Sequence, residues 1–175
     1  MITIYGFSSE QIALLNEMMS PENLAMIGYS GGGGGGGNSV SSLTQAEINA
    51  ILNTISDSTQ KSVLSYALTK VGYPYSQDLR DTGNYYDCSS LAYYSWRAAG
   101  VDISYGGATT AAAEAQGLNE AGKSVTEAEL QPGDLIFYSY TNNGRYMNIS
   151  HVGIYAGNGK MVEAKNEAEG IVYGD

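Results

Sequence analysis

The sequence predicts an α+β fold in which helices come first and an antiparallel sheet follows. Apolar residues recur at helical spacing up to about residue 115, and strand-like alternation begins after the turn Gln131-Pro132-Gly133-Asp134. A third observation concerns organisation, because seven consecutive glycines, Gly31 to Gly37, interrupt the chain early. Such a run holds no regular structure. Residues 30–42 are therefore predicted to be a flexible linker between a short helical segment over 1–29 and a larger folded domain over 43–175.

Composition excludes several classes of function. The 175 residues carry a formal net charge of -10, and such a surface repels phosphate backbones, which argues against nucleic-acid partners. No apolar run approaches the ~20 residues of a membrane span, so membrane insertion is not expected, and residues 1–29 do not have the basic start and apolar core expected of a signal peptide. A single cysteine excludes internal disulfides, and a single histidine argues against structural zinc. The sequence predicts no metal and no cofactor.

Helix signals follow one another along the first two-thirds of the chain. A short helix is expected from Ser8 to about Met19. Thr44 and Glu47 form the sequence pattern of a capping box that opens a second helix. A third runs from Ser58 to a stop at Gly72. Beyond a polar loop over 76–85 lies the Cys88 helix, and a short Ala-rich helix capped by Thr109 or Thr110 is expected to end at Ala115.

Strand signals occupy the last third of the chain. The predicted strands cover 135–140, 151–155, 160–165 and 171–173, with Gly157-Asn158-Gly159 as the turn between the second and third. Helices followed by strands of this kind form two layers around one core.

The stretch from Tyr85 to Gly100 holds the only cysteine of the chain. Asp87 is a good helix N-cap and Gly100 a good helix stop, so Cys88 is expected in the first helical turn. The positive end of a helix favours the thiolate, which is the nucleophilic form of cysteine. The competing interpretation is that a lone cysteine is a small buried apolar residue.

A cysteine nucleophile needs a base, and the base needs a residue that orients it. The only histidine, His151, opens a predicted core strand. If Gly157-Asn158-Gly159 is a three-residue loop, Glu163 lies one diagonal step from His151 on the same face. If the loop is Asn158-Gly159 alone, Asn166 lies opposite His151. Both residues stay candidates for the orienting role.

The small residue Gly153 beside this pair leaves room for a side chain to cross. Backbone N–H groups of Cys88 and Ser89, at the helix start, are the donors that an oxyanion needs when a carbonyl is attacked. The residues therefore indicate acyl transfer through a thioester, with water as the usual acceptor.

Three ordered motifs resemble those of the NlpC family of cell-wall cysteine peptidases. They are Tyr86 to Leu91, Leu130 to Leu135 and His151 to Ala164, and the resemblance covers roughly residues 61–175. It implies a papain-like fold and cleavage of the peptidoglycan stem peptide between γ-D-glutamate and a diamino acid. It also implies an extracellular or cell-wall location.

The resemblance also implies roles for single residues. Cys88 resembles the family nucleophile, His151 its base and Glu163 the third polar residue, which in relatives is often a histidine. Asp87 and Ser89 resemble positions that receive the free amine of the stem peptide, and Tyr75 resembles another substrate-binding position.

The sequence departs from the family pattern in two places. Ser76-Gln77-Asp78 replaces the Trp-Gly-Gly that is common after the tyrosine, and Arg80 follows. This arginine is interpreted as a surface side chain in preference to a contact for a substrate carboxylate. The chain also ends shortly after Tyr173, where members usually continue, so the final sheet edge is expected to be missing or the chain to be a domain of a longer exported protein.

Two alternatives to a peptidoglycan endopeptidase stay open. One is an amidase or acyltransferase that uses the same Cys88 and His151 pair. The other is a catalytically silent module that binds the wall or forms part of a larger apparatus.

Overall fold

The structure, a computed structural model, describes residues 2–5, 42–104, 109–123, 125, 127–139 and 144–174. The helix predicted over 8–19 and the glycine run lie outside these residues. Within the described part of the chain, no helix is long and apolar enough to cross a bilayer.

The described residues form four α-helices. They are α3 (Gln45–Leu52), α4 (Ser58–Thr69), α5 (Cys88–Ala98) and α6 (Ala111–Glu120). The capping box of α3 is confirmed, since Glu47 N–H donates to Thr44 Oγ1 at 3.1 Å and Thr44 N–H donates to Glu47 Oε1 at 3.2 Å. The last helix, α6, runs past its predicted end at Ala115. The reason is that Leu118 continues its buried apolar face.

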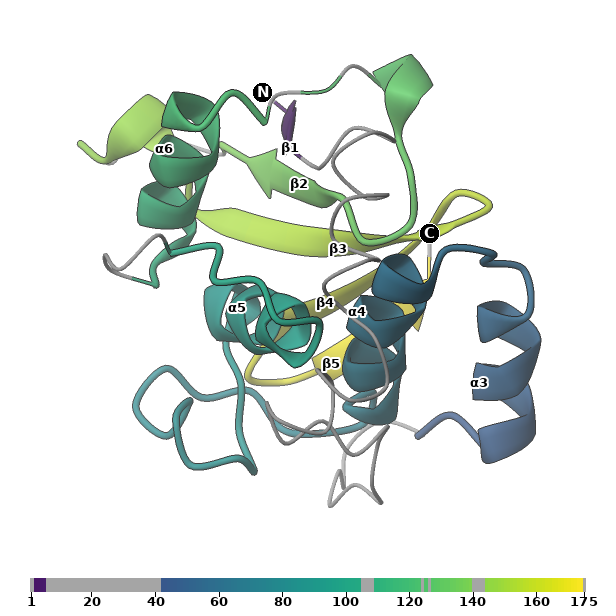
Figure 1. Cartoon of the computed structure of the whole chain (residues 1–175). Coiled ribbons are helices and arrows are strands. Elements are labelled where there is room, and N and C mark those ends of the chain that lie inside the picture. The colour runs from purple at the N-terminus through teal and green to yellow at the C-terminus, as the bar shows by residue number, and fades with distance from the viewer. Residues whose placement is uncertain are drawn as a thin grey trace.

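Five antiparallel strands form one sheet in chain order. They are β1 (Ile2–Tyr5), β2 (Leu135–Tyr138), β3 (His151–Gly157), β4 (Lys160–Asn166) and β5 (Gly170–Gly174). Strand β1 was not predicted, because residues 1–29 were expected to be helical. It pairs with β2, with Ile2 opposite Tyr138 and Tyr5 opposite Leu135. The start of the chain thus forms one edge of the sheet and β5 forms the other (Figure 1).

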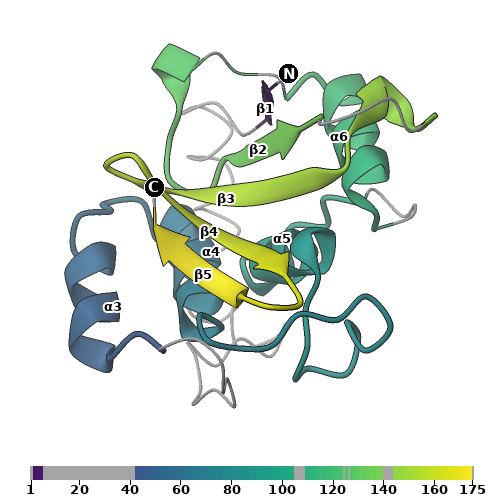
Figure 2. The same ribbon diagram turned by 180° about the vertical axis from the view of Figure 1, so that it is seen from behind.

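Helices and sheet form the two layers that the sequence predicts, which confirms the α+β class. Helix α5 packs on β3 and β4, α4 packs on α5, and α3 packs on α4. Figure 2, viewed from behind, shows β3, β4 and β5 in front of α4 and α5. The sheet is therefore covered on one face by the helix that begins with Cys88.

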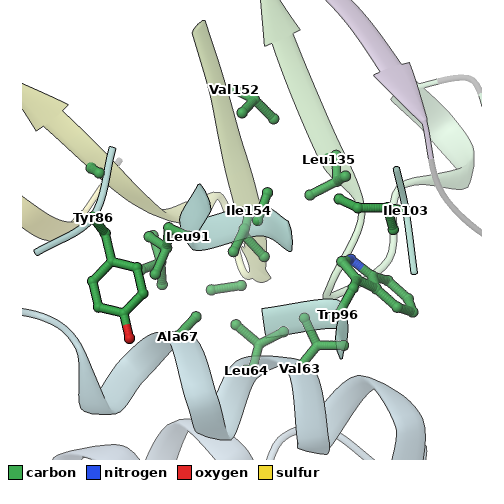
Figure 3. Close-up of a cluster of buried hydrophobic side chains, with 14 of the residues drawn as sticks. Val63, Leu64, Ala67, Tyr86, Leu91, Trp96, Ile103, Leu135, Val152 and Ile154 are labelled. Atoms are coloured by element: carbon green, nitrogen blue, oxygen red, sulfur yellow. The ribbon is translucent and has the colours of Figure 1, made fainter. Parts of the chain in front are cut away.

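The core lies between these layers. Leu64 of α4, Leu91 and Trp96 of α5 and Ile154 of β3 are each at most 2 % exposed, and they meet in one apolar cluster (Figure 3). The indole Nε1 of Trp96 also donates to the Gly133 carbonyl at 2.9 Å. This bond ties α5 to the turn that precedes β2, so the cysteine helix is fixed against the sheet.

The hairpin between β3 and β4 combines features of both predicted registers. At its tip Gly157 lies opposite Lys160 across Asn158 and Gly159, whose φ angles of 54° and 73° suit a two-residue turn. A β-bulge between Tyr155 and Gly157 then shifts the pairing by one residue, so that Ile154 lies opposite Val162. Beyond the bulge, the register is the one that the three-residue loop predicts.

Candidate active site

Cys88 is the first residue of α5, and its position is fixed by a cap on the residue before it. Asp87 Oδ1 accepts the N–H of Ser90 at 2.9 Å, while Ser90 Oγ accepts the N–H of Asp87 at 3.0 Å. This reciprocal pair forms because Asp87 is extended, with φ -102° and ψ -177°, and can reach back over the first turn. The half-buried thiol is thus held at the positive end of an 11-residue helix.

His151 is the first residue of β3 and is 8 % exposed. Its Nε2 lies 2.6 Å from Oε2 of Glu163 on the neighbouring strand β4. Asn166, the other residue that the sequence left open, is bound elsewhere. Its Oδ1 accepts the N–H of Glu169 at 2.8 Å, which closes the turn between β4 and β5. The register set by the bulge thus brings the carboxylate, and not the amide, to the imidazole.

The surroundings of His151 favour its charged form. Burial alone lowers the pKa of His151, but hydrogen bonds to Cys88 and Glu163, together with the charges of both, raise it to about 9. The imidazole is therefore protonated at neutral pH. An imidazolium beside a cysteine sulfur is the kind of partner that stabilises a thiolate.

One aromatic neighbour packs against the imidazole from the sheet side. The ring of Tyr138, on β2, lies 5.7 Å from the His151 ring. A Cβ on Gly153 would lie 2.1 Å from the sulfur of Met161, so only glycine leaves room for the methionine side chain to cross there. This confirms the expected crossing at Gly153. The Tyr138 hydroxyl donates to that same sulfur at 3.5 Å.

A cavity of about 550 Å³ opens over the sulfur, and we call it the groove. All six residues that the sequence assigned to catalysis or substrate binding line it: Tyr75, Asp87, Cys88, Ser89, His151 and Glu163. They come from three separate parts of the chain, namely the loop before α5, the start of α5 and the β3–β4 hairpin. The structure thus brings all the predicted site residues together.

Tyr75 reaches the groove through a short backbone bridge. It pairs with Tyr86 in a parallel bridge, and Ser76 N–H donates to the Tyr86 carbonyl at 3.2 Å. Burial, followed by the negative charge of Cys88, raises the pKa of Tyr75. Its hydroxyl is therefore a neutral hydrogen-bonding group beside the thiol.

Arg80 does not lie on the surface, where the sequence analysis placed it. Its side chain is 17 % exposed, and its Nη1 lies 3.0 Å from Oδ2 of Asp87. The same nitrogen donates to Ser89 Oγ at 3.1 Å, and Nη2 donates to the Thr109 hydroxyl. Burial lowers the pKa of Arg80, but hydrogen bonding to Asp87 and the charge of that carboxylate outweigh it, so the net shift is upward. The guanidinium is a fixed part of the groove wall.

Glu114 of α6 is a residue that the sequence analysis did not single out. Its side chain is fully buried, and neither carboxyl oxygen has a hydrogen-bond partner among the described residues. Burial, together with the nearby charge of Cys88, raises the pKa of Glu114 well above its ordinary value. A glutamate in an Ala-rich helix carries no local signal of burial, so the sequence gave no reason to select it.

Comparisons with known proteins indicate one family for the chain. The family model described as NlpC/P60 family matches residues 72–175. The chain is 35% identical over 115 residues to the "Bifunctional muramidase/DL-endopeptidase CwlT" of Bacillus subtilis strain 168, and the match covers 66% of this chain and 31% of that protein. It is 31% identical over 121 residues to the "Probable endopeptidase p60" of Listeria grayi, covering 68% of this chain and 21% of that one. The chain thus spans about a third or less of the length of these relatives.

Solved structures give the same result. A Staphylococcus aureus Mu50 protein described as "similar to lipoprotein, NLP/P60 family" matches with a TM-score of 0.54 and 30% identity, over 69% of this chain and 37% of that one. The peptidoglycan hydrolase RipB of Mycobacterium tuberculosis matches with a TM-score of 0.51 and 26% identity, over 95% of this chain and 78% of that one.

Proposed function

Because the chain belongs to the NlpC/P60 family, we propose that it is a peptidoglycan hydrolase, and specifically a cysteine endopeptidase that cleaves the stem peptide. One observation carries the proposal, namely the 2.6 Å contact of Glu163 with His151 in the groove that also holds Cys88. Covalent acyl transfer needs a nucleophile, a histidine that can donate and accept a proton, and a carboxylate that orients the histidine.

In the proposed reaction the Cys88 thiolate attacks the carbonyl carbon of the scissile peptide bond. The His151 imidazolium gives its proton to the leaving amine as the C–N bond breaks, which leaves a thioester on Cys88. Neutral His151 then takes a proton from water, whose oxygen attacks the thioester and releases a carboxylic acid and the thiolate. Glu163 holds the imidazole throughout. The N–H groups of Cys88 and Ser89, which make no intrahelical bond at the helix start, face the developing oxyanion.

The proposed bond joins γ-D-glutamate to the diamino acid of the stem peptide. Support comes from the named activity of one relative, a DL-endopeptidase, at 35% identity. Tyr75 and Ser89 are the proposed contacts to the peptide on the Cys88 side of the groove. Such a substrate places the reaction outside the cell or in the cell wall, and the glycine run is consistent with further domains of a longer exported protein.

Mass spectrometry of purified muropeptides tests this function. Incubation with the chain should produce two fragments whose masses add up to the parent plus one water, with the new ends at the γ-D-glutamyl bond. Cys88→Ala should give no fragments, while Arg97→Ala, which alters an exposed residue of the same helix, should retain cleavage. A far-UV circular dichroism spectrum of each variant verifies that it is folded. A folded wild-type chain that leaves every muropeptide intact between pH 6 and pH 9 would contradict the proposal.

Alkylation by iodoacetamide reports on the nucleophile alone, because Cys88 is the only cysteine. The imidazolium beside it should make alkylation faster than that of a free thiol, whose pKa is about 8.5. A rate equal to that of a free thiol would favour a catalytically silent module. Rapid alkylation without muropeptide cleavage would instead favour an amidase or acyltransferase.

A further inference from the structure

Tyr138 lies directly across the sheet from His151. It is the last residue of β2, and the pairing of β2 with β3 places the two residues opposite each other. The N–H of Ser150 donates to the Tyr138 carbonyl at 3.0 Å, which fixes this end of the strand pair. The centres of the two rings are 5.7 Å apart, and the ring planes are inclined by 38°. The tyrosine ring therefore forms one side of the space that the imidazole occupies.

The other contacts of the imidazole leave one motion of the ring poorly restrained. Its Nε2 lies 2.6 Å from Oε2 of Glu163, and His151 is also hydrogen-bonded to Cys88. An imidazole makes such bonds through its ring nitrogens, in the plane of the ring. They direct the nitrogens but resist a tilt of the ring only weakly. A side chain packed against the ring resists the tilt, and Tyr138 is placed to do so.

Tyr138 is itself held by a residue from β4, two strands away. Its hydroxyl donates to the sulfur of Met161 at 3.5 Å. Met161 lies opposite Tyr155 in the pairing of β3 with β4, and its side chain reaches β2 by crossing β3 over Gly153. A Cβ on Gly153 would lie 2.8 Å from Cγ of Met161 and closer still to its sulfur. One side chain thus connects three neighbouring strands, β2, β3 and β4 (Figure 2).

Neither Tyr138 nor Met161 is among the described residues that line the groove. Any effect of these two side chains on the proposed reaction therefore passes through His151. A thioether sulfur is a weak hydrogen-bond acceptor, so the bond between the two residues adds little to the stability of the sheet. What the bond does determine is where the Tyr138 hydroxyl, and with it the ring, lies beside the imidazole.

We propose that Tyr138 is a positioning residue for His151, and that Met161, crossing over Gly153, holds Tyr138 in place. The inference rests on the proposed function, in which His151 gives a proton to the leaving amine and then takes one from water. Both transfers need a ring nitrogen aimed at the reacting atom, and a ring that tilts is misaligned for part of the time. Loss of the support should therefore slow turnover without weakening substrate binding.

Nuclear magnetic resonance of the imidazole tests the positions directly, because the chain has one histidine and its ring gives a single set of signals. The ring current of Tyr138 shifts the imidazole C–H signals, so Tyr138→Leu should move them. Met161→Leu keeps an apolar side chain of similar volume but removes the sulfur acceptor, and it should move the same signals by a smaller amount. Gly153→Ala should do likewise, because the added methyl group displaces the flexible side chain of Met161.

Kinetics of muropeptide cleavage test the consequence. We expect kcat to fall roughly tenfold in Tyr138→Leu and several-fold in Met161→Leu, with KM changed by less than about twofold because neither residue lines the groove. Gly153→Ala and Met161→Ala should not be additive. If Gly153 acts by leaving room for Met161, the double variant should lose about as much kcat as Met161→Ala alone, and not the product of the two losses.

Tyr155→Phe is the matched control. It removes a tyrosine hydroxyl from β3 that accepts the N–H of Gly159 at 3.2 Å, at the tip of the hairpin. Both the imidazole signals and kcat should stay at the wild-type values in this variant. A far-UV circular dichroism spectrum verifies that each variant is folded.

The outcomes separate this inference from the proposed function. Folded Met161→Leu and Gly153→Ala variants that melt at lower temperature but keep the wild-type imidazole signals and kcat would overturn the inference alone, because Met161 would then be structural only. A folded Tyr138→Leu variant with the wild-type kcat would also overturn it. If the folded wild-type chain cleaved no muropeptide, the proposed function would fail whatever the imidazole signals, and the inference with it.

Discussion

The charge of His151 determines which proton transfers the groove can support. At a pKa of about 9 the imidazole holds its proton through the neutral range, although it is 8 % exposed. Burial opposes this charge, so the carboxylate of Glu163 and the contact with Cys88 are what keep it. The site therefore begins its proposed reaction with the proton that the leaving amine needs, and activity should be lost when this proton is lost at high pH.

Glu163→Gln tests that dependence, because glutamine keeps the shape of the side chain and removes its charge. Without the carboxylate the pKa of His151 should fall, because less negative charge then offsets the lowering of this pKa by burial. The alkaline limb of a plot of kcat/KM against pH should move to lower pH by about one unit. Turnover at the optimum should fall roughly tenfold. Muropeptide cleavage measured from pH 6 to pH 10 gives both quantities.

Asn166→Ala is the matched comparison for this prediction. The side chain of Asn166 closes the turn between β4 and β5, so its loss should affect thermal stability more than the alkaline limb. If Asn166→Ala moved the alkaline limb while Glu163→Gln did not, the assignment of the orienting residue would be reversed.

Sequence reasoning found some residues of the site and missed others for a physical reason. The sequence could predict the positions of Cys88, His151 and Glu163, because a helix cap, a strand and a hairpin are local patterns. It could not predict those of Arg80 and Glu114, because what defines them is contact with distant segments. Arg80 donates to Thr109, which lies 29 residues further along the chain, and Glu114 is fully buried close enough to Cys88 for the charge of that residue to raise its pKa. No spacing rule within one segment reports such contacts.

At the scale of single elements, the β3–β4 hairpin shows how a shift of one residue in the pairing decides which side chain contacts His151. The turn residues Asn158 and Gly159 suit a two-residue turn, which alone would bring Asn166 opposite His151. The bulge at Gly157, with φ 91°, shifts the register so that Glu163 reaches the imidazole. The sequence could predict the hairpin but not the bulge, because the local pattern of residues was compatible with both registers.

The turn before β2 contains a second carboxyl with an altered pKa. Asp134 is 2 % exposed, and burial raises its pKa to about 7, although its Oδ2 accepts the N–H of Gln131 at 2.9 Å. The ordinary value, which applies to the unfolded chain, is 3.8. The folded state therefore binds this proton more tightly. The resulting stabilisation is fully present below about pH 4 and is lost as the pH rises through 7.

Asp134→Asn should remove this pH dependence, because an amide oxygen can accept the same N–H and never ionises. Near pH 4 the melting temperatures of the variant and of the wild-type chain should be similar. Near pH 8 the variant should melt several degrees higher, since a shift of this size corresponds to a few kcal/mol, on the order of 1.4 per pH unit. Thermal unfolding followed by circular dichroism from pH 4 to pH 8 measures the difference.

The control for this measurement is Glu120→Gln, which removes a carboxylate from an exposed position at the end of α6. Its melting temperature should differ from that of the wild-type chain by a small amount that does not grow between pH 4 and pH 8. A difference for Asp134→Asn that is equally constant across this range would mean that Asp134 is ionised in the folded protein throughout.

At the scale of the whole molecule, the sheet joins the two ends of the described chain. Strand β1 begins at Ile2 and pairs with β2, while β5 at the other edge ends at Gly174. The sequence predicted the order of helices and the later strands, because each has a periodic local pattern. It did not predict β1, since four residues are too few to define a period and their partner lies more than a hundred residues away.

A variant with prolines at two adjacent positions, Thr3→Pro together with Ile4→Pro, tests what β1 contributes. Along an antiparallel edge strand alternate residues point their N–H groups at the partner, so two adjacent prolines remove at least one donor and disrupt the pairing. The loss of about two hydrogen bonds, each about 1 kcal/mol, should lower the melting temperature by roughly 4–8 °C in a domain of this size. The uncovered edge of β2 should also promote self-association, visible by size-exclusion chromatography.

Activity should respond differently from stability in this variant. Strand β2 separates β1 from His151, so muropeptide cleavage per folded molecule at 25 °C should stay near that of the wild-type chain. The matched control, Thr3→Val together with Ile4→Val, keeps the N–H groups and the strand preference and should melt close to the wild-type temperature. An unchanged melting temperature in the proline variant would mean that β1 adds nothing to the stability of the sheet, and that β2 is an adequate edge by itself.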